Sequence, residues 1–110
     1  MRNLLKLVVP CTEESKPWVA ELNNKDRGQQ IQSKIDSEAG VWLASHGDTR
    51  SNSGERLEIG IEFVYRNFEL AKLQFIEAVR QLHPPHGTRL VHIIHDPNDA
   101  SFDFETLAEW

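Results

Sequence analysis

The amino-acid sequence predicts an α+β domain in which a four-stranded antiparallel sheet carries helices on one face. Residues 57–65 alternate apolar and polar side chains, as a half-buried strand does. Residues 67–82 place apolar side chains three and four positions apart, as an amphipathic helix does. At 110 residues, the chain 1–110 fits a single globular domain with its own core.

The first third of the chain predicts a strand followed by helix. The apolar run 3–9 is short and contains two adjacent valines, so we expect a buried strand that Pro10 ends. Residues 12–38 are rich in helix formers, and Ser15 followed by Pro17 suits a helix start. A continuous helix is weakened by Asn23, Asn24 and Gly28, so we expect one or two pieces. Read at period two, residues 24–38 would instead form a strand, with one face made by Ile31, Ser33, Ile35 and Ser37.

The middle of the chain predicts two strands and a helix. Residues 41–45 read as a short strand, and the wholly polar stretch 46–56 reads as a solvated loop. The strand 57–65 would present Glu58 and Glu62 on its wet face. Asn67 is suited to cap the helix that follows, and the residues from His83 to Gly87, which include two prolines, end it.

The last third predicts one more strand and a short helix. Residues 89–95 read as a strand, residues 96–99 as a turn, and Ser101 as the cap of a helix that runs through Glu109. The order strand, helix, strand, strand, helix, strand matches the architecture of ferredoxin-like sandwiches. This fold hosts many functions, so the architecture carries none of them to this chain.

Composition excludes several classes of protein. The single cysteine, Cys11, excludes an internal disulfide framework and a cysteine-based zinc site. No apolar run approaches the length of a membrane span, and Lys6 interrupts the N-terminal one, which argues against a signal peptide. We therefore expect a cytoplasmic protein without membrane contact. Phosphate-binding glycine motifs are absent and the basic residues are scattered, so nucleic-acid binding is not expected.

The charge is concentrated at the C-terminal end. The net charge is −5, and residues 1–95 hold 12 bases and 12 acids, which cancel. Residues 96–110 hold five acids and no base, together with Phe102, Phe104, Leu107 and Trp110. These apolar residues either close the core or, with the carboxylates, meet a basic partner. The residues that we expect to bind a partner are Asp96, Asp99, Asp103, Glu105, Glu109, Trp110, Glu58 and Glu62.

The histidines support a second interpretation. His92 and His95 lie in one predicted strand, and His46 lies in the predicted loop beside Ser45 and Asp48. A pocket lined by His92, His95 or His46 would indicate a small enzyme or a ligand-binding domain. Strand alternation places His92 and His95 on opposite faces, so we expect no metal site. The sequence shows no nucleophile motif and no cofactor motif, so we assign no catalytic residue and no cofactor.

These observations favour an interaction protein over an enzyme. Inhibitors of the immunity-protein type, which neutralise basic nuclease toxins, resemble this chain in size and acidity alone. Carboxylates accelerate association with a cationic partner, and aromatic residues supply buried contacts. A homodimer paired through the open sheet face is compatible with the same features.

Overall fold

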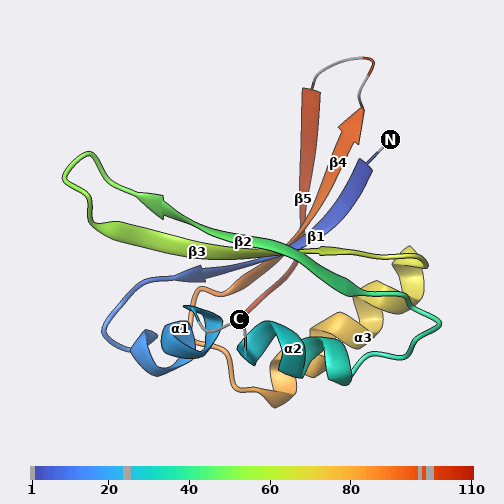
Figure 1. Cartoon of the computed structure of the whole chain (residues 1–110), viewed down its shortest axis with the longest axis horizontal. Coiled ribbons are helices and arrows are strands. Elements are labelled where there is room, and N and C mark those ends of the chain that lie inside the picture. The colour runs from blue at the N-terminus through green and yellow to red at the C-terminus, as the bar shows by residue number, and fades with distance from the viewer. Residues whose placement is uncertain (1, 24–25, 97, 99–100) are drawn as a thin grey trace.

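The computed structural model describes residues 2–23, 26–96, 98 and 101–110, and the statements below concern these residues. They form five strands in one antiparallel sheet and three helices (Figure 1). The strands are β1 (Arg2–Pro10), β2 (Trp42–Arg50), β3 (Arg56–Val64), β4 (Arg89–Asp96) and β5 (Ser101–Glu109). The helices are α1 (Lys16–Asn23), α2 (Asp26–Ser33) and α3 (Phe68–Gln81). The strand order is β2-β3-β1-β4-β5, so β1 is central and β2 and β5 are the two edges.

The core lies between the sheet and the helices. Alternate residues of β3 are buried from Ile59 to Phe63, and the same face of β1 carries three fully buried side chains. Phe63 of β3 and Phe75 of α3 meet edge to face, with 4.9 Å between ring centroids. Phe63, Phe75 and Val79 belong to the apolar faces that the sequence predicts for this strand and this helix, and all three are fully buried. The core residues contributed by the sheet are Leu5, Leu7, Val9, Ile59, Ile61, Phe63 and Leu90.

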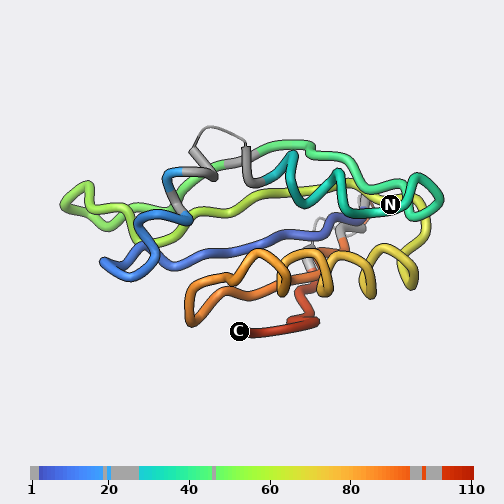
Figure 2. Tube along the Cα trace, turned by 90° about the horizontal axis from the view of Figure 1, so that it is seen from below, coloured from blue at the N-terminus to red at the C-terminus, as the bar shows by residue number. Residues whose placement is uncertain are grey.

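Local hydrogen bonds set where the helices begin. Ser15 Oγ accepts from the amide of Thr12 at 2.8 Å in the turn before α1. Asn67 Oδ1 accepts from the amide of Leu70 at 3.3 Å, so Asn67 caps α3 as expected. In the part of residues 24–38 that the structure describes, α2 covers residues 26–33, so the strand reading there is wrong. The helices lie below the sheet in Figure 1, and Figure 2 views the molecule from that side.

The predicted fold class is wrong in its strand count and at its C-terminal end. The sheet has five strands, and residues 101–109 form β5 where a short helix was expected. The predicted four-stranded ferredoxin-like sandwich is therefore not the fold of this chain. Aromatic residues and threonine at 102, 104 and 106 alternate with acids at 103 and 105, which is a strand period. Pairing also gives the backbone of β4 a partner on its second side.

The polar stretch 46–56 is also more ordered than its composition predicts. β2 continues to Arg50, and β3 already starts at Arg56. Residues 45–50 pair with β3 although most of them are exposed and polar. An edge strand needs one partner strand and no buried face, so apolar content does not reveal it.

Candidate partner-binding site

The C-terminal acidic segment forms an edge of the sheet. β5 pairs with β4 on one side and has no strand on the other among the described residues. Six consecutive pairs, from Val91↔Thr106 to Asp96↔Ser101, keep one register. The register shifts only between Leu90 and Val91, near the far end of the strand. β5 therefore offers a regular stretch over residues 101–106.

The described side chains of this stretch divide by face. Asp103 and Glu105 stand opposite Ile94 and His92, on the side of the sheet that faces the core. Phe104 and Thr106 stand opposite Ile93 and Val91, on the other side. All four are exposed, and Phe104 retains 67% of its accessible surface. Phe104 is the most exposed large apolar side chain among the described residues.

The other sheet edge, β2, is built differently. Its pairing with β3 is interrupted twice, between Leu43 and Ser45 and between Thr49 and Arg50. Its charges also compensate one another, because Asp48 binds Arg50 at 3.0 Å and Arg56 at 3.1 Å. Bulges and charged side chains are ordinary protections of a strand edge. β5 carries carboxylates without neighbouring bases in its own strand.

Backbone hydrogen bonds hold the end of β5 in place. The amide of Trp110 donates to the carbonyl of Thr88 at 2.9 Å, and the amide of Gly87 donates to the carbonyl of Trp110 at 2.8 Å. Trp110 is half-buried against the core, together with Leu107. Of the two aromatic side chains that the structure describes in this segment, Phe104 is thus the more exposed. Glu109 is exposed and stands opposite Arg89 of β4.

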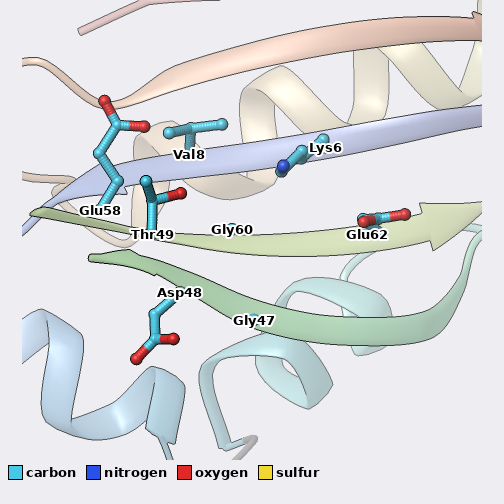
Figure 3. A pocket seen from close by; sticks show the side chains of 8 residues that line it. All are labelled: Lys6, Val8, Gly47, Asp48, Thr49, Glu58, Gly60 and Glu62. Atoms are coloured by element: carbon cyan, nitrogen blue, oxygen red, sulfur yellow. The ribbon is translucent and has the colours of Figure 1, made fainter. Parts of the chain in front are cut away.

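Glu58 and Glu62 lie on the sheet face that points away from the core, along one side of a shallow pocket (Figure 3). Lys6 of β1 stands opposite Glu62, and its side chain reaches over Gly60, which separates the two glutamates. A Cβ on Gly60 would come within 2.4 Å of Lys6 Cε, so the glycine makes room for the lysine stem. This pocket is lined by Lys6, Val8, Gly47, Asp48, Thr49, Glu58, Gly60 and Glu62.

The predicted partner-binding residues therefore fall into two groups. Asp103, Glu105 and Glu109 share β5, whereas Glu58 and Glu62 lie on β3, with β1 and β4 between the two groups. Arg89 stands between them, opposite Glu109 and 3.5 Å from Glu58. A half-exposed pair at this distance contributes little to stability. The backbone of Asp96 belongs to β4, its side chain is not described, and Asp99 lies outside the described residues.

His92 belongs to a polar cluster under the core-facing side of the sheet. Its Nε2 lies 2.7 Å from Tyr65 Oη, and Phe68 stacks on the imidazole with 4.2 Å between centroids. Burial lowers the pKa of His92, and the carboxylate of Glu105 partly opposes this. Burial raises the pKa of Tyr65, against a side-chain hydrogen bond from Asn3. Asn3 Oδ1 is buried and has no hydrogen-bond partner among the described residues.

His92 lines neither of the two pockets that the structure describes. His92 is 6% exposed and lies beneath Phe68. The side chains of His46 and His95 are not described. Within the described residues, no group of three or more histidine, cysteine, aspartate or glutamate side chains is arranged to hold a metal ion.

Cys11 lies in a second surface pocket, between β1 and α1. Burial raises the pKa of its thiol, and the nearby Arg56 partly opposes the rise. A raised pKa decreases the thiolate fraction, so this cysteine lacks the activation that a nucleophile needs. The pocket is lined by Cys11, Thr12, Glu13, Ser15, Lys16, Glu55 and Arg56.

Two features of the candidate site were missed by reasoning from the sequence. One is the exposure of Phe104, which the period-two alternation of residues 102–106 could have indicated. The other is Lys6 over Gly60, for which a glycine within a strand was the available signal.

The helices that the structure describes are all too short or too polar to cross a membrane. No protein-family model matches the chain, and neither a curated protein nor a solved structure matches it.

Proposed function

We propose that the protein is an acidic binding module that receives a basic protein partner at β5. One observation carries the proposal. A regular edge strand displays the exposed carboxylates of Asp103 and Glu105 and the exposed ring of Phe104, and the whole segment 96–110 contains no base. Carboxylates on an exposed edge attract a cationic surface, and an exposed aromatic residue gives area to bury on contact.

Within this class, we propose an inhibitor of the immunity type, acting in the cytoplasm on a basic enzyme such as a nuclease toxin. The acidity of the segment supports this class, since a nuclease must carry positive charge to hold nucleic acid. The absence of disulfide-forming cysteine pairs in the sequence, which contains Cys11 alone, is compatible with a reducing compartment. A ligand pocket around His92 is less favoured, because that ring is enclosed by neighbouring side chains.

The test compares capture of partners by matched variants. The double variant Asp103→Asn/Glu105→Gln removes two charges from β5 while keeping similar side-chain shapes. The control, Glu14→Gln/Glu38→Gln, removes two charges from exposed positions before α1 and after α2. Each immobilised protein is exposed to an extract of the source organism, and retained proteins are identified by mass spectrometry.

We expect a basic protein that the wild type and the control retain and the β5 variant loses. With that protein purified, the β5 variant should associate about tenfold more slowly at low salt, and the difference should shrink at high salt. If the partner is a nuclease, an equimolar amount of the wild type should stop its digestion of DNA. Retention that is equal for all three proteins, with normal melting curves, would contradict the proposal.

A further inference from the structure

We infer that β5 accepts an extended segment of the basic partner as a sixth strand, and that this segment alternates basic and apolar residues. The inference rests on the proposed function and specifies its mode of binding. Strand addition uses the free backbone groups of an edge for affinity and the alternating side chains for specificity.

The regularity of β5 supports strand addition at this edge. Residues 101–106 pair with β4 without a register shift. β2, the opposite edge, is interrupted twice and carries compensated charges. A strand can therefore extend along β5 over six residues without a register shift. The longest such stretch of β2 is the five residues 45–49, and its carboxylate, Asp48, is already paired with Arg50 and Arg56.

The two faces of β5 specify the alternation. An added strand continues the pleat, so its side chains lie beside those of β5 on each face. On the core-facing side its neighbours are Asp103 and Glu105, which favour lysine or arginine. On the other side its neighbours are Phe104 and Thr106, which favour apolar residues.

The apolar side chains of the added strand would extend a row of apolar side chains that already crosses the sheet. Leu4 of β1, Ile93 of β4 and Phe104 of β5 stand opposite one another across three neighbouring strands. Ile93 is 7% exposed, whereas Phe104 at the edge is 67% exposed. An apolar side chain on an added strand would be the fourth member of this row and would cover Phe104.

Charge selects a basic segment over a second copy of this chain. Pairing two β5 strands would bring the carboxylates of Asp103 and Glu105 close to those of the other copy. Like charges across a strand pair are destabilising, whereas opposite charges are stabilising. The occupant is therefore a cationic strand.

The experiment uses synthetic peptides as probes of the full chain. One fluorescent peptide alternates lysine and valine over seven residues, and the other has the same composition with all lysines before all valines. Binding is measured by anisotropy at low salt, and backbone protection is measured by hydrogen exchange. The proteins are the wild type, Asp103→Asn/Glu105→Gln, Phe104→Thr and the control Glu14→Gln/Glu38→Gln.

We expect the alternating peptide to bind the wild type about tenfold more tightly than the block peptide, since only the alternating one matches both faces. It should slow exchange of amides in residues 101–106 and leave residues 45–49 unchanged. Phe104→Thr should reduce the preference for alternation, the β5 charge variant should weaken both peptides, and the control should bind as the wild type does.

The outcomes separate this inference from the function on which it rests. Equal binding of both peptides, weakened by the β5 charge variant, overturns strand addition and leaves charge recognition intact. Binding that the β5 charge variant does not weaken counts against both proposals. Protection at residues 45–49 instead of 101–106, a dimer of the free chain paired through β5, or no peptide binding each overturns the inference.

Discussion

Tyr65 and His92 are joined by a hydrogen bond of 2.7 Å between Tyr65 Oη and His92 Nε2. The two residues come from different parts of the chain, since Tyr65 follows β3 and His92 lies within β4. Phe68, at the start of α3, stacks on the same imidazole. These contacts thus connect the end of β3, the first turn of α3 and the middle of β4.

Removing the phenol oxygen should destabilise the fold. Tyr65→Phe leaves His92 Nε2 buried without its partner, so we expect a loss of about 1–2 kcal/mol in the free energy of unfolding. Urea denaturation at neutral pH measures it. The double variant Tyr65→Phe/His92→Leu should recover part of the loss, because replacing both partners with apolar groups leaves no buried polar atom unpaired. A double variant less stable than Tyr65→Phe alone would contradict this account.

The pKa of His92 predicts a pH dependence of stability. Because burial lowers the pKa of folded His92 below its ordinary value of 6.5, the unfolded chain binds a proton more readily than the folded one. The contribution of this residue is therefore complete above pH 6.5 and is lost as the pH falls from there through the folded pKa. Melting temperatures at about pH 7.5 and about pH 5 should differ more for the wild type than for His92→Gln. Equal differences for the two proteins would show that His92 does not contribute.

The aromatic pair at the centre of the core predicts a large effect of truncation. Phe75 is fully buried and meets Phe63 edge to face, so Phe75→Ala should cost about 3–5 kcal/mol. Leu73 of the same helix is 64% exposed, and Leu73→Ala should change stability by less than about 0.5 kcal/mol. Thermal melting of both variants provides the comparison. Similar shifts in the two melting temperatures would mean that the buried face of α3 is assigned wrongly.

Gly40 and Gly54 both have a left-handed backbone conformation, but only at Gly40 would an added Cβ also meet a neighbouring side chain. Gly40 has φ +66°, and a Cβ there would lie 2.5 Å from Arg66 Cβ. Gly54 has φ +88° with open space around it. Gly54→Ala should therefore cost only the left-handed conformation, about 1 kcal/mol, and Gly40→Ala should cost clearly more. Chemical denaturation of the two variants tests this, and equal costs would exclude a steric role for Arg66.

Several elements of the fold could be predicted from local pattern alone. Residues 57–65 and 67–82 have strong periodicity, because each buries one face against a core, and both elements formed near the expected bounds. Asn67 was recognisable as a cap because its side chain acts within one helical turn. β1 and β4 were recognisable because central strands are rich in apolar residues.

The edge strands could not be recognised in the same way. β5 was read as a helix because Ser101 suits a helix cap, although residues 102–106 alternate at period two. Most of β2 was read as a loop because it is polar. Edge strands take their stability from pairing with a neighbour that is distant in the sequence, and local composition carries little trace of it.

The candidate site likewise has properties that can be predicted from the sequence and others that depend on strand pairing. The amino-acid sequence is enough to place the net charge of −5 and three aromatic residues in the last fifteen residues. Strand pairing in the folded chain makes this segment a sheet edge, with Asp103 and Glu105 on one face and Phe104 on the other. The tertiary structure likewise separated Glu58 and Glu62 from it by two strands and enclosed His92 beneath Phe68. Charge is a property of each residue, whereas its neighbours and the face it occupies depend on which strands pair, and pairing is a long-range contact.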